Sequence, residues 1–189
     1  MTYLGTIEKA IKVMRNGGLI LYPTDTIWGI GCDATREDAI GKIYKLKERE
    51  DQKSMLVVVS NSEMIADYVQ EVPSIAWELL DAASDPLTII YPGAINLANN
   101  LVSSDKSIGI RVCKSEFCKE LILRFRKPII STSANISGNA FPKSFQEIDN
   151  KIKTGVDYIC DEPQIKLSPG KPSSIIKIGL GNEIKIIRK

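Results

Sequence analysis

Residues 129–138, IISTSANISG, combine a short apolar run with four side-chain hydroxyls, one amide and a glycine. The whole chain contains no histidine, and no acidic residue stands close enough in sequence to turn one of these serines into a nucleophile. Ser-His and Cys-His pairs and histidine-based metal centres are therefore excluded. Two interpretations stay open for Ser133 and Asn135. They could close a Ser or Asx turn, or they could bind phosphate oxygens and a base or ribose edge of a ligand.

Arg111 is a second residue that could take part in binding or catalysis. It interrupts residues 107–112, SIGIRV, an otherwise apolar segment typical of a buried strand. Burial of a charge costs free energy unless a partner compensates it. The partner is either an internal carboxylate or one that a ligand brings, and the sequence leaves both alternatives open.

Residues 44–55, YKLKEREDQKSM, supply positive charge near the end of a predicted helix. Lys47 and Arg49 stand where the helical pattern stops, and an arginine fork beside an ammonium group is a common way to hold a polyphosphate. Acidic residues dilute the segment, so taken alone it favours a solvated helix end.

The loop after the first predicted strand also gathers small polar groups. Residues 21–34, LYPTDTIWGIGCDA, place Thr24, Asp25 and Thr26 directly after Pro23 and before two glycines. Ligands of open α/β sheets bind beyond the carboxyl ends of strands, so a binding loop is expected here. The same residues could simply cap a turn, and they lack the spacing of a phosphate-binding P-loop.

The elements that must position these segments alternate along the chain. Apolar spacing predicts helices over 7–14, 35–50, 61–69, 74–83 and 115–126, the second with Thr35 as its N-cap. Apolar runs predict strands over 19–22, 54–60, 87–91, 107–113, 128–131, 156–160, 173–178 and 183–188. The alternation predicts an α/β fold, and the short connections in the last third favour antiparallel pairing, so we expect a mixed sheet. Residues 163–172 form a long irregular stretch that we expect to be functional or mobile.

Composition limits the class of protein. With 189 residues, 43% of them hydrophobic and 25% charged, the chain fits a single domain over residues 1–189 and not a disordered or fibrous protein. No apolar stretch approaches the ~20 residues of a membrane span, and the first residues lack the apolar core of a secretion signal. We therefore expect a cytoplasmic protein without membrane contact.

A net charge of +2 is too small to indicate nucleic-acid binding by itself. The four scattered cysteines are expected to be buried, reduced thiols.

In their order along the chain, these segments resemble the YrdC-type family of L-threonylcarbamoyladenylate synthases, in its short single-domain form. The resemblance rests on PTDTIWGIGCDA, KLKERE with its K-x-R, YPGAINLA, IGIRV, STSANISG with its S-x-N, and SSIIKI followed by IIR. It runs from about residue 6 to the last residues, and the combination is far more specific than any one segment. It implies a YrdC-like open sheet, twisted and mixed, flanked by helices and with a concave, positively lined cavity.

The resemblance also implies an activity. The family forms threonylcarbamoyl-AMP and pyrophosphate from L-threonine, bicarbonate and ATP, and a separate transferase complex then modifies tRNA to threonylcarbamoyladenosine (t6A). Both nucleophiles come from the substrates, so the enzyme has to supply position and charge rather than a histidine base. Mg²⁺ is expected to accompany ATP. The alternatives are an RNA-binding or ribosome-maturation module, with RNA or tRNA contact, and a carbamoyl-adenylate-forming paralogue.

Site residues follow from the same resemblance. Lys47 and Arg49 are expected to be the catalytic pair, and Arg111 is expected to be the partner of the threonine carboxylate. The full ATP-binding set is Lys47, Arg49, Lys53, Ser131, Ser133, Asn135 and Arg188, and the threonine-binding set is Thr26, Ser107, Arg111 and Ser173. The chain departs from the family pattern at Val58, where some relatives carry a histidine, and at Trp28, Asn96, Cys113 and Ser174.

Overall fold

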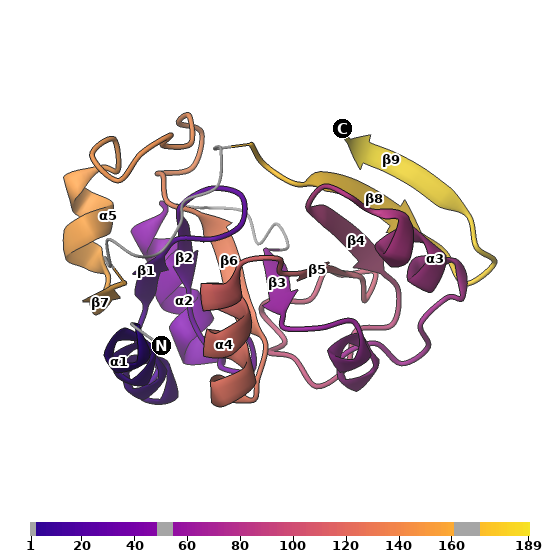
Figure 1. Ribbon diagram of the computed structural model, residues 1–189, viewed down its shortest axis with the longest axis horizontal. Helices are drawn as coiled ribbons and strands as arrows, with labels where there is room; N and C mark the ends of the chain where they lie inside the picture. Colours follow the sequence, from indigo (N-terminus) through magenta and orange to yellow (C-terminus); the bar gives the residue numbers. More distant parts are fainter. Residues whose placement is uncertain (1–2, 49–54, 161–170) are drawn as a thin grey trace.

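The computed structural model describes residues 3–48, 55–160 and 171–189, which form an open sheet flanked by helices (Figure 1). The strands are β1 (Ile20–Tyr22), β2 (Gly29–Gly31), β3 (Leu56–Val59), β4 (Leu87–Tyr91), β5 (Ile108–Val112), β6 (Ile129–Ser133), β7 (Tyr158–Ile159), β8 (Ser174–Ile178) and β9 (Ile184–Arg188). The helices are α1 (Leu4–Arg15), α2 (Glu37–Leu46), α3 (Ile75–Ala82), α4 (Glu116–Phe125), α5 (Asn150–Gly155) and the 3-10 helix η1 (Glu63–Asp67). Within the described ranges, no helix has the length and apolarity that crossing a membrane requires.

The sheet mixes both kinds of strand pairing. Its order is β7-β1-β2-β6-β3-β5-β4-β8-β9. The pairs β1–β7, β3–β5 and β4–β8 are parallel, whereas β1–β2, β2–β6, β3–β6, β4–β5 and β8–β9 are antiparallel. The predicted α/β fold with a mixed sheet is therefore confirmed, as is the antiparallel pairing of the last two strands. β7 differs from the prediction because it lies at the opposite edge of the sheet, parallel to β1.

Short elements account for the other differences from the prediction. Two elements were not predicted: β2, which has only three residues, two of them glycine, and α5, which is too short to show helical periodicity. The predicted helix over 61–69 is the 3-10 helix η1. Thr35 is not the N-cap of α2, because the helix begins at Glu37 and the Thr35 hydroxyl donates to the Asp33 carboxylate at 2.6 Å. Arg49, Lys53 and residues 163–170 lie outside the described residues.

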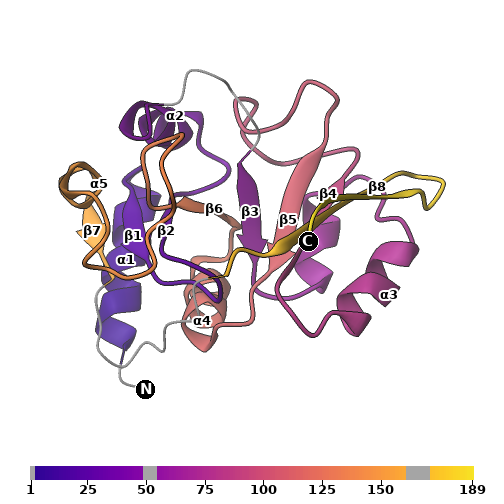
Figure 2. The ribbon, with the colours of Figure 1, turned by 90° about the horizontal axis from the view of Figure 1, so that it is seen from above.

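Alternate residues of β1 and of the position before it face two separate hydrophobic clusters. Leu19 and Leu21 belong to a cluster that includes the buried face of α2. Ile20 and Tyr22 belong to a second cluster, which α1 and α4 cover from the other side of the sheet (Figure 2). This alternation follows from the two-residue repeat of a β-strand with helices on both faces. All four cysteines are buried free thiols, as expected.

Gly31 leaves no room for a side chain between β1 and β6, and its replacement is a test of the packing there. A Cβ at this position would lie 2.7 Å from the buried Tyr22 ring and 3.0 Å from the Ile130 carbonyl oxygen. Gly31→Ala is therefore expected to lower the free energy of unfolding by about 1–3 kcal/mol, measured by urea denaturation.

The matched control is Gly41→Ala in α2, where a Cβ would meet nothing within 4 Å. Because alanine favours a helix interior, this variant should raise the free energy of unfolding by about 0.5–1 kcal/mol. Equal stability of the two variants would contradict the packing argument.

Candidate functional site

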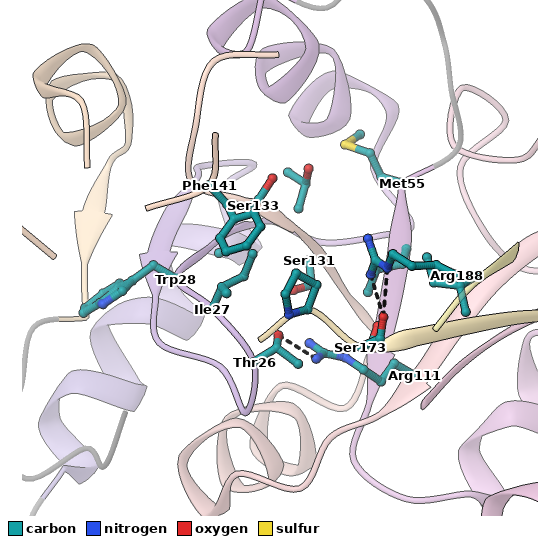
Figure 3. Close-up of a pocket in the computed structure, with 15 residues that line it drawn as sticks. Thr26, Ile27, Trp28, Met55, Arg111, Ser131, Ser133, Phe141, Ser173 and Arg188 are labelled. Carbon is teal, nitrogen blue, oxygen red and sulfur yellow. Dashed lines mark hydrogen bonds between the residues drawn. The ribbon is translucent and has the colours of Figure 1, made fainter. Parts of the chain in front are cut away.

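A cavity of about 220 Å³ lies among segments that are distant in sequence (Figure 3). The β1–β2 loop, the start of β3, β5, β6, the loop after β6, and the paired strands β8 and β9 all contribute to its lining. Hydroxyl groups come from Thr26, Ser131, Thr132, Ser133 and Ser173, positive charges from Arg111 and Arg188, and apolar surface chiefly from Ile27, Met55 and Phe141. The cavity thus offers two cations and several hydroxyl groups beside an apolar wall.

The strand register explains why two arginines meet in this cavity. Arg111 of β5 lies opposite Thr88 of β4, Thr88 lies opposite Ile175 of β8, and Ile175 lies opposite Arg188 of β9. Directly opposed residues of neighbouring strands project from the same face of a sheet. The register therefore brings two charges that are far apart in sequence to one level of one face.

Arg111 is buried, with only 2% of its surface exposed. Its Nη1 donates to the Thr26 hydroxyl at 2.8 Å and forms an ion pair with Asp25 at 3.1 Å. The other Asp25 oxygen accepts a hydrogen bond from the Lys114 backbone N–H at 3.0 Å. Of the two partners that the sequence left open for Arg111, the structure shows the internal carboxylate, and the arginine still lines the cavity.

Arg188 closes the cavity from the edge of the sheet. Its Nε and Nη2 both donate to the Ser173 carbonyl oxygen, at 3.0 and 2.7 Å (Figure 3). The Ser173 hydroxyl is in turn hydrogen-bonded to the buried Thr88 hydroxyl at 2.8 Å. Partial burial, and then the positive charge of Arg111, lower the pKa of Arg188. The two positive charges repel each other within one cavity, so a bound anion would stabilise both guanidinium groups.

Lys47 is not among the lining residues of the cavity, but it holds the S-x-N segment, residues 133–135, in place. It follows α2 directly, is buried, and donates from Nζ to the carbonyl oxygens of Ser133 and Asn135 at 2.5 and 2.6 Å. The Lys47 carbonyl accepts a hydrogen bond from the Ser137 backbone N–H at 2.9 Å. The lysine therefore ties α2 to the loop that follows β6, and its ammonium group lies next to the cavity wall.

The structure brings six of the predicted site residues together and separates others. Thr26, Arg111, Ser131, Ser133, Ser173 and Arg188 all line the cavity. Lys47 and Asn135 are connected to its wall but are not among the lining residues, and the Asn135 side chain donates to the carbonyls of Ile136 and Asn139. The Asn135 side chain therefore closes the turn, which is one of the two alternatives that the sequence left open, and its contact with ATP stays a prediction.

The prediction for Ser107 does not fit the cavity. Its hydroxyl donates to Asp105 at 2.6 Å, and Asp105 pairs with Lys177, which holds the pKa of that carboxyl to about 2. Ser107 precedes Arg111 by four positions, which is roughly 13 Å along an extended strand. The two residues share a motif in sequence but are held apart by the strand itself.

Several contributors to this region were not among the predicted site residues. Asp25 was noted in the expected binding loop together with Thr24 and Thr26, but it was assigned no contact with Arg111. Met55 and Phe141 gave no local signal, because single apolar residues beside strands are more often part of the core. Trp28, in contrast, touches the cavity but packs its ring against that of Phe145 in a tilted arrangement, with 5.1 Å between the ring centroids.

The lining indicates what the cavity can bind. Two guanidinium groups and a row of hydroxyls suit carboxylate or phosphate oxygens, and the apolar side chains suit a base or a small aliphatic group. The described part of the lining contains no carboxylate, and the described residues hold no cluster of three acidic, cysteine or histidine residues that could coordinate a metal ion. The cavity is therefore suited to binding an anionic ligand.

Comparison with known families agrees with this geometry. The Sua5/yciO/yrdC family profile, described as "Telomere recombination", matches residues 12–189. The chain belongs to the Sua5/YciO/YrdC family. Curated relatives of this family member include the threonylcarbamoyl-AMP synthase of Psychromonas ingrahamii, 30% identical over 190 residues and covering 95% of each chain. The protein of the same name from Hahella chejuensis is 31% identical over 172 residues, which cover 90% of this chain and 89% of the relative.

Solved structures show the same fold. E. coli YciO superposes with a TM-score of 0.83 at 23% identity, covering 98% of this chain and 89% of that protein. P. abyssi Sua5, solved in complex with L-threonine, superposes with a TM-score of 0.80 at 24% identity and covers 92% of this chain. The chain spans about half the length of that Sua5 protein, 51%. The YrdC-like open mixed sheet is therefore confirmed.

Proposed function

We propose that this chain is an L-threonylcarbamoyladenylate synthase, a nucleotidyltransferase that forms threonylcarbamoyl-AMP and pyrophosphate from L-threonine, bicarbonate and ATP. The observation that carries the proposal is a single cavity in which two guanidinium groups face the hydroxyls of the S-x-N segment. Family membership and relatives named threonylcarbamoyl-AMP synthase, about 30% identical over most of the chain, support the same activity.

On this proposal, L-threonine binds with its carboxylate at Arg111. The guanidinium is held by Thr26 and Asp25 and is almost fully buried, so a carboxylate bound there would be shielded from water. Ser173, on the neighbouring side of the cavity, offers a hydroxyl that is already oriented by Thr88. L-threonine is the ligand named for the P. abyssi Sua5 structure, which has the same fold.

ATP is proposed to occupy the side of the cavity formed by β6 and β9. Ser131 and Ser133 would donate to phosphate or ribose oxygens, and Arg188 would neutralise phosphate charge. Met55 and Phe141 supply the apolar surface that a base requires. Lys47, Arg49 and Lys53 stay proposed phosphate ligands on the family resemblance, and Lys47 is connected to this side through the carbonyls of Ser133 and Asn135.

Both nucleophiles of the reaction come from the substrates, and the threonine amine reacts after its ammonium form has released a proton to solvent. The threonine amine attacks the carbon of bicarbonate, water leaves, and an oxygen of the resulting carbamate attacks the α-phosphorus of ATP, which releases pyrophosphate. The protein contributes alignment of the substrates and neutralisation of the developing negative charge, the principal effects in transfers to phosphorus. A chain without histidine is well suited to such a reaction.

Mg²⁺ is proposed to enter bound to the triphosphate. The described lining offers hydroxyl oxygens but no carboxylate to hold the ion on the protein, so the phosphates would supply most of its ligands. When bound, the ion would neutralise the charge of the leaving pyrophosphate.

The proposed product would serve t6A formation in tRNA, through a downstream threonylcarbamoyl transferase complex in the cytoplasm. A role as an RNA-binding module is not favoured, because the feature that unites the site is a small anion-binding cavity. The two readings make different predictions: an RNA-binding module binds RNA without consuming ATP, whereas the synthase consumes ATP only when threonine and bicarbonate are present.

Pyrophosphate release from ATP is the decisive measurement. We expect release that requires both L-threonine and bicarbonate, together with a new species of the mass of threonylcarbamoyl-AMP. Omitting threonine measures background ATP hydrolysis. Release that is independent of threonine, or no release from folded protein with all substrates present, would rule out the proposed activity.

Ser133→Ala tests the assignment of the S-x-N segment to ATP. Loss of one hydrogen bond to a phosphate or ribose oxygen should raise the KM for ATP by about 3- to 30-fold, with little effect on the KM for threonine. The control is Ser137→Ala in the same loop, where the side chain is exposed. If Ser133→Ala leaves the ATP affinity unchanged, Ser133 has only the turn-closing role.

A further inference from the structure

Asp25 is a buried carboxylate that touches the site but is not among its lining residues. It lies in the β1–β2 loop and is 8% exposed. One oxygen accepts the Lys114 N–H at 3.0 Å, so the carboxylate is fixed to the chain directly after β5. The other oxygen lies 3.1 Å from Nη1 of Arg111. Among the ion pairs recorded for the described residues, only this one has both side chains at most 5% exposed.

The pairing uses only one end of the guanidinium. The side-chain hydrogen bond and the ion pair recorded for Arg111 with the described residues are both made by Nη1, to Thr26 and Asp25, and Nε finds no hydrogen-bond acceptor there. A guanidinium carries five N–H donors in one planar fork. Asp25 Oδ1 accepts no hydrogen bond from the described residues, so Asp25 acts on the fork through the ion pair alone and leaves its donors free.

We propose that Asp25 is a positioning residue for amino-acid binding: it holds Arg111 from behind, so that the remaining donors of the guanidinium receive the carboxylate of the substrate. This inference rests on the proposed function, because it takes L-threonine as the substrate. It adds a role for a residue that does not itself contact the substrate.

The physical reason is the behaviour of an unpaired buried cation. Without Asp25, Arg111 would keep its charge in a buried position, with the Thr26 hydroxyl as the one side-chain partner recorded among the described residues. Such a group is unstable and moves toward solvent or toward another acceptor. If the guanidinium has to move back into position before it can bind the carboxylate, the movement costs free energy. The ligand then binds more weakly than to a guanidinium already in place.

Asp25→Asn is the direct test, because the amide keeps the shape of the carboxylate and its oxygen can still accept the Lys114 N–H. We expect the KM for L-threonine to rise by about 10-fold or more, while the KM for ATP changes less than about threefold. L-threonine binding measured by calorimetry should weaken by a similar factor. An unchanged threonine affinity in folded Asp25→Asn protein would overturn the proposal.

Asp33→Asn is the matched control. Asp33 is 1% exposed and forms an ion pair with Lys127 at 2.8 Å, but it lies beyond β2 and does not line the cavity. This variant also removes a buried charge and is expected to lower the melting temperature, while the KM for threonine stays at the wild-type value. A threonine effect of equal size in both variants would mean that general loss of stability is the cause.

A double-mutant cycle separates positioning from an independent effect. In an Arg111→Gln background, Asp25→Asn should weaken threonine binding no further, since the residue through which it acts is gone. Additive losses would overturn the proposal. If Asp25→Asn does not fold, Asp25→Glu takes its place: the charge is kept but displaced by one methylene, and the KM for threonine should still rise selectively.

The same experiments separate failure of the proposed function from failure of the positioning role. A wild-type protein that makes no threonylcarbamoyl-AMP contradicts the proposed function. An active wild-type protein whose Asp25 variants bind L-threonine normally contradicts only the positioning role.

Discussion

Replacing Arg111 with glutamine should lower threonine-dependent pyrophosphate release by about 100-fold or more, because the proposed substrate carboxylate loses its charged partner. Most of the loss is expected as a higher KM for threonine. The residue is 2% exposed, and glutamine cannot reproduce the planar fork that contacts Thr26 and Asp25. The measurement is the full dependence of the rate on threonine at saturating ATP.

The same substitution should also weaken the fold. Asp25 would remain buried without its cation, and removal of one partner of a buried ion pair costs about 3–5 kcal/mol. Urea denaturation measures this loss. Activity must therefore be assayed at a temperature at which circular dichroism shows a folded variant.

Two further variants serve as comparisons for Arg111→Gln. Arg111→Lys keeps the charge and loses the fork, so it should retain more stability than Arg111→Gln while threonine binding stays weak. Lys177→Gln removes an exposed ion pair with Asp105, and such pairs contribute at most about 1 kcal/mol. Wild-type threonine kinetics in folded Arg111→Gln protein would remove Arg111 from the substrate site.

The case of Arg111 shows what a sequence can and cannot reveal. A charge inside an apolar strand is visible in the sequence, and so is its need for a partner. The partner is not visible, because Asp25 lies 86 positions away and meets Arg111 only through the order of the strands. The strands and most helices were predictable because their patterns are local, whereas β2 was missed because three residues carry almost no pattern.

Ser107 and Lys47 show the same limit for site residues. The sequence places Ser107 in one motif with Arg111, yet the extended strand separates them and Asp105 engages the hydroxyl. It places Lys47 in a K-x-R motif next to a proposed phosphate, yet the ammonium donates to two backbone carbonyls. A motif suggests candidates for a site, but the fold and the hydrogen bonds of each side chain decide which of them reach the site and what they do there.

Lys47→Ala is expected to have the second-largest effect. The substitution leaves the carbonyl oxygens of Ser133 and Asn135 without the donor that joins them to the end of α2. Hydrogen bonds to a charged group each contribute about 1.5–3 kcal/mol, so loss of the two bonds is expected to lower the free energy of unfolding by roughly 3–6 kcal/mol. Displacement of Ser133 from the cavity wall should lower turnover by about 100-fold or more.

Stability and nucleotide affinity together separate two roles for this lysine. If Lys47 served only as a phosphate ligand, its removal would weaken ATP binding and leave unfolding of the ligand-free protein nearly unchanged. If it organises the S-x-N loop, unfolding and ATP binding change together, and added ATP does not restore the stability that was lost. Hydrogen exchange at the amide of Ser137, which donates to the Lys47 carbonyl, should also become faster.

Lys45→Ala is the control, since Lys45 lies two residues earlier near the same end of α2 and is exposed. It removes the same charge from the same region but should change neither stability nor turnover by more than about twofold in rate, or ~0.5 kcal/mol in unfolding. Wild-type turnover in Lys47→Ala would exclude both roles. Lost turnover with unchanged stability would indicate that Lys47 acts as a phosphate ligand. The conformation of the S-x-N loop would then depend on β6 and on the turn itself, and not on Lys47.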